Sequence, residues 1–154
     1  MITNTLTEII FRGSALCVDL SFLKILMSGC IVSRFDVPEV DNVIEYKAAL
    51  EVISSNEYID FVVTANKISI GERSLQNVFA NLGLNEGHYE LLLFFDLKDL
   101  DYRSYKASID SLKEWTDKFQ KDYNFEYAVC QLDNGSENEY YFDSNGLGPL
   151  YKQT

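Results

Sequence analysis

The side chains that most often carry out nucleophilic or acid–base chemistry are sparse in this sequence. His88 is its only histidine and precedes a long apolar run. A catalytic triad, a histidine acid–base pair or a multi-histidine metal site would therefore depend on this one residue. The sequence also lacks the Gly-x-Ser-x-Gly pattern that places a serine nucleophile on a sharp turn. We therefore expect no catalytic residues and no enzymatic activity, and interpret His88 as an exposed loop residue.

Two weaker patterns suggest a bound metal or cofactor. Asp96, Asp99 and Asp101 supply carboxylate oxygens, but they lack the glycine and final glutamate of a calcium loop. Asp99 or Asp101 is more simply the N-cap of the helix that follows. Gly146 and Gly148 have the spacing of a nucleotide loop, but we expect no helix after them to hold a phosphate. The sequence thus predicts no metal and no cofactor.

The cysteines and the apolar segments indicate the compartment. Cys17, Cys30 and Cys130 are widely spaced and lie in apolar runs, so we expect buried free thiols. Such thiols are typical of a reducing compartment. The first seven residues lack the basic charge of a signal peptide, and the apolar stretch Leu20–Val32 is only 13 residues long. We expect a cytoplasmic protein without membrane contact.

Charge is the most informative feature of the sequence. The chain has 24 acidic and 13 basic residues and a formal net charge of −11. This excess argues against a nucleic-acid binder, which needs a positive field. Asp122–Tyr151 contains six acidic residues and no Lys or Arg, and Phe35–Tyr46 contains four. Such stretches either keep the protein soluble or attract a basic partner.

The C-terminal acidic stretch also contains neighbouring tyrosines. In a strand, Tyr140 and Tyr141 point to opposite faces, so we expect one in the core and the other exposed. An exposed tyrosine among carboxylates is typical of an interface anchor with a polar rim. The predicted partner-binding residues are Asp133, Glu137, Glu139, Tyr140, Tyr141 and Asp143.

Hydrophobic periodicity predicts the elements that position these residues. Strands are expected at Thr5–Arg12, Ile31–Phe35, Tyr58–Thr64, Tyr89–Leu97, Phe125–Leu132 and Glu139–Asp143. Helices are expected at Ser21–Met27, Asp41–Ser54, Ser74–Leu82 and Tyr102–Asp122. Asp41 would begin the second of these helices. Ser74 would begin the third, and Gly83 would follow its last residue.

This order favours one α+β domain over residues 1–154. Its sheet would be mixed or antiparallel, with helices mainly on one face. Asn134-Gly135 is a strong turn signal and predicts a C-terminal β-hairpin. A doubly wound parallel sheet is the alternative, which the missing phosphate loop after the first strand disfavours.

In size, acidity, element pattern and lack of catalytic residues, the chain resembles the small acidic immunity proteins that bacteria make against nuclease toxins, including those of contact-dependent inhibition systems. The resemblance covers the whole chain and is carried by these properties, not by a motif. It implies an intracellular protein that binds a basic toxin domain and covers its active site. Two alternatives stay open: an acidic interaction module or homo-oligomer, and an enzyme with an unfamiliar carboxylate site.

Overall fold

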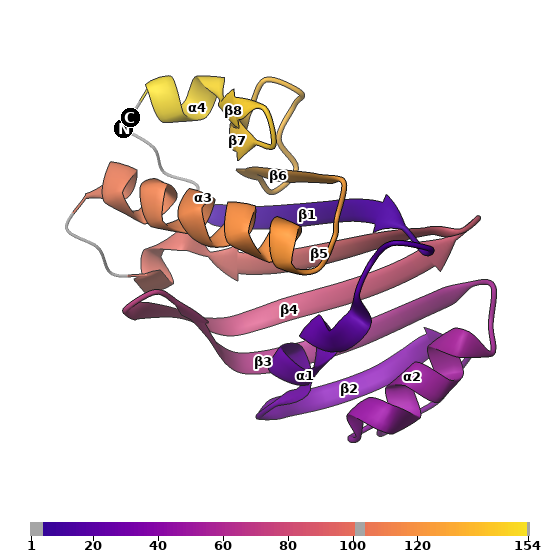
Figure 1. Cartoon of the computed structure of the whole chain (residues 1–154). Coiled ribbons are helices and arrows are strands. Elements are labelled where there is room, and N and C mark those ends of the chain that lie inside the picture. Colours follow the sequence, from indigo (N-terminus) through magenta and orange to yellow (C-terminus); the bar gives the residue numbers. More distant parts are fainter. Residues whose placement is uncertain (1–4, 101–103, 154) are drawn as a thin grey trace.

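The computed structural model describes residues 5–100 and 104–153, which form a twisted antiparallel sheet with helices packed against it (Figure 1). Within these residues the sheet has eight strands in the order β2-β3-β4-β5-β1-β6-β7-β8, and every neighbouring pair is antiparallel. The strands are β1 (Leu6–Ser14), β2 (Cys30–Val37), β3 (Ile59–Ile70), β4 (Arg73–Asn85), β5 (His88–Asp96), β6 (Tyr127–Leu132), β7 (Tyr140–Asp143) and β8 (Gly146–Leu147). The predicted α+β class is confirmed, and the parallel alternative is wrong.

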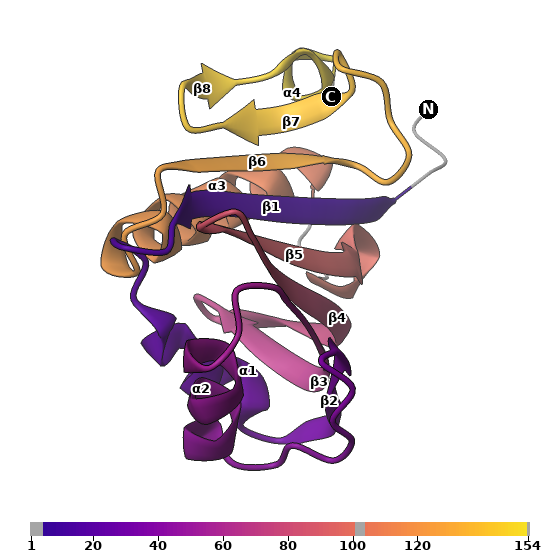
Figure 2. The same cartoon turned by 90° about the vertical axis from the view of Figure 1, so that its right-hand side faces the viewer.

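The helices cover one face of the sheet. They are the 3₁₀ helices η1 (Leu20–Phe22) and η2 (Leu97–Leu100) and the α-helices α1 (Leu23–Met27), α2 (Tyr46–Ser54), α3 (Tyr105–Asp122) and α4 (Pro149–Lys152). Figures 1 and 2 place α1, α2 and α3 on the same side of the strands. In the described part of the chain, no helix covers the opposite side, which we call the open sheet face.

The helix α3 joins two strands that are not neighbours. Strands β5 and β6 both pair antiparallel with β1, which lies between them, so β5 and β6 run in the same direction. The unit β5-α3-β6 is therefore a split βαβ crossover. The chain then returns through the predicted C-terminal hairpin, in which Asn134 has a φ of 57°.

Aromatic side chains join α3 to the sheet. The ring of Phe11 on β1 lies 4.7 Å from that of Phe119 on α3 and 5.3 Å from that of Phe125, between ring centroids. Trp115 is half-buried and meets Phe11 edge-on at 6.3 Å. The apolar stripe of the predicted long helix therefore faces the core, and burial of these rings stabilises the crossover.

The predicted helix Ser74–Leu82 is wrong, because this segment belongs to β4. Leu75, Val78, Phe79 and Leu82 follow helical spacing in the sequence. In the structure, Asn77 has a φ of 54° and shifts the side-chain alternation by one position. Leu75 and Val78 are therefore both buried, and strict alternation of buried residues continues to Leu84. Pairing with β3 and β5 overrides the local helical pattern.

Two predicted helices begin later than expected. Helix α2 starts at Tyr46, not at Asp41, because the preceding residues lie along the outer edge of β2. There the Val43 backbone N–H donates to the Ser33 carbonyl at 2.9 Å. Helix α3 starts at Tyr105, and its N-cap is Ser104, whose hydroxyl accepts a hydrogen bond from the Ala107 N–H at 3.0 Å.

The other expected cap residues and the glycine pair have different roles. Asp99 lies in η2, and Asp101 is outside the described residues. The expectation that no helix follows Gly148 is also wrong, since Gly148 is the N-cap of the four-residue helix α4. The C-terminal helix α4 thus packs against β7 (Figure 1).

Candidate partner-binding surface

Three of the predicted carboxylates lie in the loop between β6 and β7. We call residues 133–139 the acidic loop. It is anchored to β1, since the Asp133 N–H donates to the Leu6 carbonyl at 3.1 Å. It is closed by Glu139, whose carboxylate accepts from the Ser136 N–H at 3.1 Å. Glu137 is exposed, whereas Asp133 and Glu139 are half-buried. The acidic loop is therefore a tied turn that presents carboxylates at one end of the sheet.

The fourth carboxylate, Asp143, lies at the other end of β7. Four steps along an extended strand separate it from Glu139, which corresponds to about 13 Å. It lies opposite Val129 on β6 and accepts a hydrogen bond from the Asn145 N–H at 2.8 Å. Burial and then the negative charge of Asp143 raise the pKa of nearby Tyr127. The predicted carboxylates thus form two groups instead of one cluster.

The two tyrosines of β7 have different surroundings, as the sequence predicts. Tyr140 is half-buried, and its ring lies over Gly148, where a Cβ atom would come within 2.5 Å of it. Tyr141 is fully buried, and its hydroxyl shares a hydrogen bond with the hydroxyl of Tyr105 on α3. Burial raises the pKa of Tyr141 above its ordinary value. Tyr141 therefore holds β7 against α3 and offers no side-chain surface to a partner.

The remaining residues singled out in the sequence also have defined places. His88 is exposed, as expected, but it begins β5 and is not a loop residue. Cys130 is buried and Cys30 half-buried, but Cys17 is exposed, so the expectation of buried thiols is wrong for Cys17. The Asp96 carboxylate accepts hydrogen bonds from the Thr5 hydroxyl at 2.6 Å and the Lys98 N–H at 3.1 Å.

Residues 5–100 and 104–153 contain neither a metal-binding cluster nor a helix that could span a membrane. No group of three or more histidine, cysteine, aspartate or glutamate side chains is arranged there to hold a metal ion. In the same residues, every helix is too short or too polar to cross a membrane.

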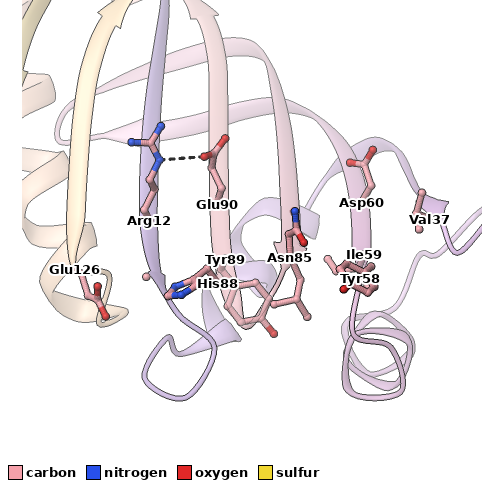
Figure 3. Close-up of a pocket in the computed structure, with 13 residues that line it drawn as sticks. Arg12, Val37, Tyr58, Ile59, Asp60, Asn85, His88, Tyr89, Glu90 and Glu126 are labelled. Atoms are coloured by element: carbon pink, nitrogen blue, oxygen red, sulfur yellow. Dashed lines mark hydrogen bonds and ion pairs between the residues drawn. The ribbon is translucent and has the colours of Figure 1, made fainter.

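Sequence reasoning missed a pocket on the open sheet face (Figure 3). It has a volume of about 560 Å³ and lies across the ends of β1, β5, β4 and β3. The Arg12 guanidinium donates to the Glu90 carboxylate at 3.0 Å on one side, and Asp60 lies on the other. The Asp60 carboxylate accepts from the Asn81 amide. The pocket combines the β4–β5 hairpin with residues of β1 and β3 that are distant from it in the sequence, so only polar residues alternating within strands hinted at it.

Comparison with known proteins identifies a family and a similar structure. The family model described as PABL017 Cdi1I immunity protein matches residues 6–145. The chain is also similar to a chain in the 1.75 Å crystal structure of the toxic C-terminal tip of CdiA from Pseudomonas aeruginosa in complex with immune protein. The TM-score is 0.72 and the identity 22%, and the match covers 96% of this chain and 99% of that chain. No curated protein sequence matches. The structural likeness shows that the two chains share a fold over almost their whole length.

Proposed function

The chain belongs to the PABL017 Cdi1I immunity protein family, and from this premise we propose that it binds and neutralises the toxic C-terminal tip of a CdiA protein from the same host. The observation that carries the proposal is the family match over residues 6–145. The chain would act by occupying the toxin, as one folded partner bound to another. Such an action needs no catalytic residue, cofactor, nucleic acid or membrane, and it would take place in the cytoplasm.

The charge of the chain supports a basic partner of the nuclease type. A nuclease active site is built to receive phosphates, and carboxylates can take their place. The acidic loop offers Asp133, Glu137 and Glu139, and the formal net charge of −11 extends this field over the molecule. Complementary fields of this kind speed the encounter of two proteins and fix their orientation. We propose that the acidic loop and the adjoining Tyr140 face the toxin's active site, and that Asp143 at the other end of β7 makes a separate contact with the toxin.

The alternative of a homo-oligomer built by strand pairing has less support. The edge strand β2 is covered in part by residues 40–43, and the Phe35 N–H donates to the Val40 carbonyl at 2.8 Å. The other edge strand, β8, has only two residues. Short and covered edges oppose pairing with a second copy.

Reversing the charge of two residues in the acidic loop tests whether this loop attracts the toxin. In the variant Glu137→Lys with Glu139→Lys, we expect association with the purified CdiA toxic tip to slow by about tenfold at low ionic strength, and less at physiological salt. The dissociation rate should change less, because long-range attraction acts mainly on the encounter. Stopped-flow mixing at two salt concentrations measures both rates.

A matched variant separates the position of the charges from their number. Glu72→Lys with Glu114→Lys changes the net charge by the same amount at exposed sites in the β3–β4 turn and on α3. It should slow association less than the loop variant does. Thermal melting of both variants shows whether they are folded. Equal association rates for the folded loop variant and the parent would contradict the proposed role of the acidic loop.

A further inference from the structure

We propose that the pocket on the open sheet face receives an arginine or lysine side chain of the toxin domain and so anchors the complex. This inference rests on the proposed function, since it names a second contact with the same partner. It concerns a surface that lies apart from the acidic loop, on strands β1, β5, β4 and β3. The floor, the charge and the walls of the pocket support this inference, and the chemistry of the pocket disfavours other occupants.

The floor of the pocket lies at Gly83, which has no side chain to fill the space above it. Residues directly opposite each other on antiparallel strands point to the same face, and Gly83 lies opposite both Glu90 on β5 and Asp60 on β3. Two strand spacings separate the carboxylate-bearing residues, or about 10 Å, and the residue between them has no side chain. A Cβ atom built on Gly83 would meet only the Glu90 carbonyl oxygen, at 4.0 Å. Gly83 thus leaves room for one inserted side chain.

The charge of the pocket selects a cation. Asp60, Glu90 and Glu126 line it, whereas Arg12 is its one Lys or Arg. Arg12 bonds to one oxygen of Glu90, and Asn81 bonds to one oxygen of Asp60. An ionised carboxylate offers about four acceptor sites, so both groups can accept further hydrogen bonds. These contacts also hold the carboxylates in place before binding, which reduces the entropy lost in the complex.

The walls of the pocket fit the stem of a long basic side chain. Val37 is 50% exposed and Tyr58 is 53% exposed, and both line the pocket beside Asp60 (Figure 3). Lysine and arginine bury their methylene groups along apolar surface while the charged end remains among polar groups. The ring of Tyr58 adds a surface for a cation. Arginine is one of the residue types that dominate interface energetics when they fill such a socket.

The same chemistry disfavours the other occupants of this face. A nucleic acid or an acidic peptide would bring negative charge against Asp60 and Glu90. A second copy of this chain also carries a net charge of −11 and is repelled. A basic domain is attracted by the net charge of −11, and on the open sheet face the pocket offers its side chain both carboxylates.

Filling the pocket tests the inference directly. In Gly83→Val, the new side chain occupies the floor, and valine suits a strand, so we expect a melting temperature equal to or above that of the parent. Binding to the purified CdiA toxic tip, measured by calorimetry, should weaken by about 30-fold, as for loss of a hot-spot contact. The control Gln76→Val places the same side chain on an exposed site of β4 outside the pocket and should bind as the parent does.

Removing the charge without filling the space identifies the occupant. Asp60→Asn with Glu90→Gln keeps the volume and should also weaken binding by at least about tenfold, while Glu72→Gln with Glu114→Gln should not. If Gly83→Val weakens binding but the amide variant binds like the parent, the occupant is not a cation and the inference is wrong. If the acidic-loop variant weakens binding while Gly83→Val does not, the pocket lies outside the interface. If the parent does not bind the toxic tip, the proposed function fails, and this inference fails with it.

Discussion

Cys130 gives the fold a sensitivity to alkaline pH. Its side chain is fully buried on β6, and burial raises the pKa of the thiol above its ordinary value of 9.0. The unfolded chain releases this proton as the pH passes 9, whereas the folded chain retains it. The unfolded state then binds fewer protons than the folded state does. The contribution of the buried thiol to the free energy of unfolding is therefore fully present below pH 9 and is lost as the pH rises. Between pH 8 and pH 10, the parent should therefore lose about 1.4 kcal/mol more unfolding free energy than Cys130→Ala does.

Urea unfolding at the two pH values, under reducing conditions, measures this difference. Cys17→Ala removes a thiol that is exposed in the native state. Between the two pH values, the unfolding free energy of this variant should therefore fall by as much as that of the parent. An equal loss in Cys130→Ala and the parent would show that the buried thiol does not contribute to the pH dependence.

At the residue scale, the sequence predicts surface charge better than it predicts a site. The acidic residues of the C-terminal stretch and the burial of one tyrosine of the pair follow from composition and strand alternation. The separation of Asp143 from the acidic loop is also implied by the expected strand Glu139–Asp143, because the two carboxylates lie at its opposite ends. The pocket is harder to predict. Gly83 is interpreted from the sequence as the end of a helix, and its importance arises only because Asp60 and Glu90 pair with it.

At the element scale, β4 depends on an unusual backbone conformation. Asn77 has a φ of 54°, in the left-handed region that asparagine and glycine tolerate better than other residues do. We expect Asn77→Ala to lower the free energy of unfolding by about 1 kcal/mol, because alanine adopts this conformation at a cost. Asn77→Gly should lower it less. Urea denaturation of both variants measures the effect.

The neighbouring position provides the comparison for this prediction. Gln76 precedes Asn77, is also exposed and has no positive φ, so Gln76→Ala should change stability by less than Asn77→Ala does. Equal losses of stability at both positions would show that the left-handed conformation of residue 77 costs alanine nothing extra.

The success of an element prediction follows the length of its pattern. The stripe of α3 repeats from Tyr105 to Phe119, which no strand alternation imitates, and the predicted helix is confirmed apart from its first residues. The pattern of β4 combines two alternations that meet at Asn77, and a short window of it matches a helix. Local periodicity cannot separate these cases, because the deciding contacts are with β3 and β5.

At the scale of the whole molecule, residues 5–100 and 104–153 place no helix on one face of the large sheet (Figure 2). The α+β class and the one-sided placement of the helices are predicted from the order of the elements. The strand order is not, because β1 inserts between β5 and β6 through pairings distant in sequence. The resemblance to immunity proteins, based on size, charge and element pattern, is confirmed by the family match over residues 6–145.

Titration calorimetry with the purified CdiA toxic tip from the same host shows whether this chain neutralises a toxin by binding it. We expect an equimolar complex with a dissociation constant of about 10 nM or lower at physiological salt. The dissociation constant should rise with ionic strength, because the attraction is electrostatic. The same equimolar mixture should lose the activity of the toxin. Absence of heat and of a complex at micromolar concentrations, with both proteins folded, would show that the chain does not neutralise this toxin by binding it.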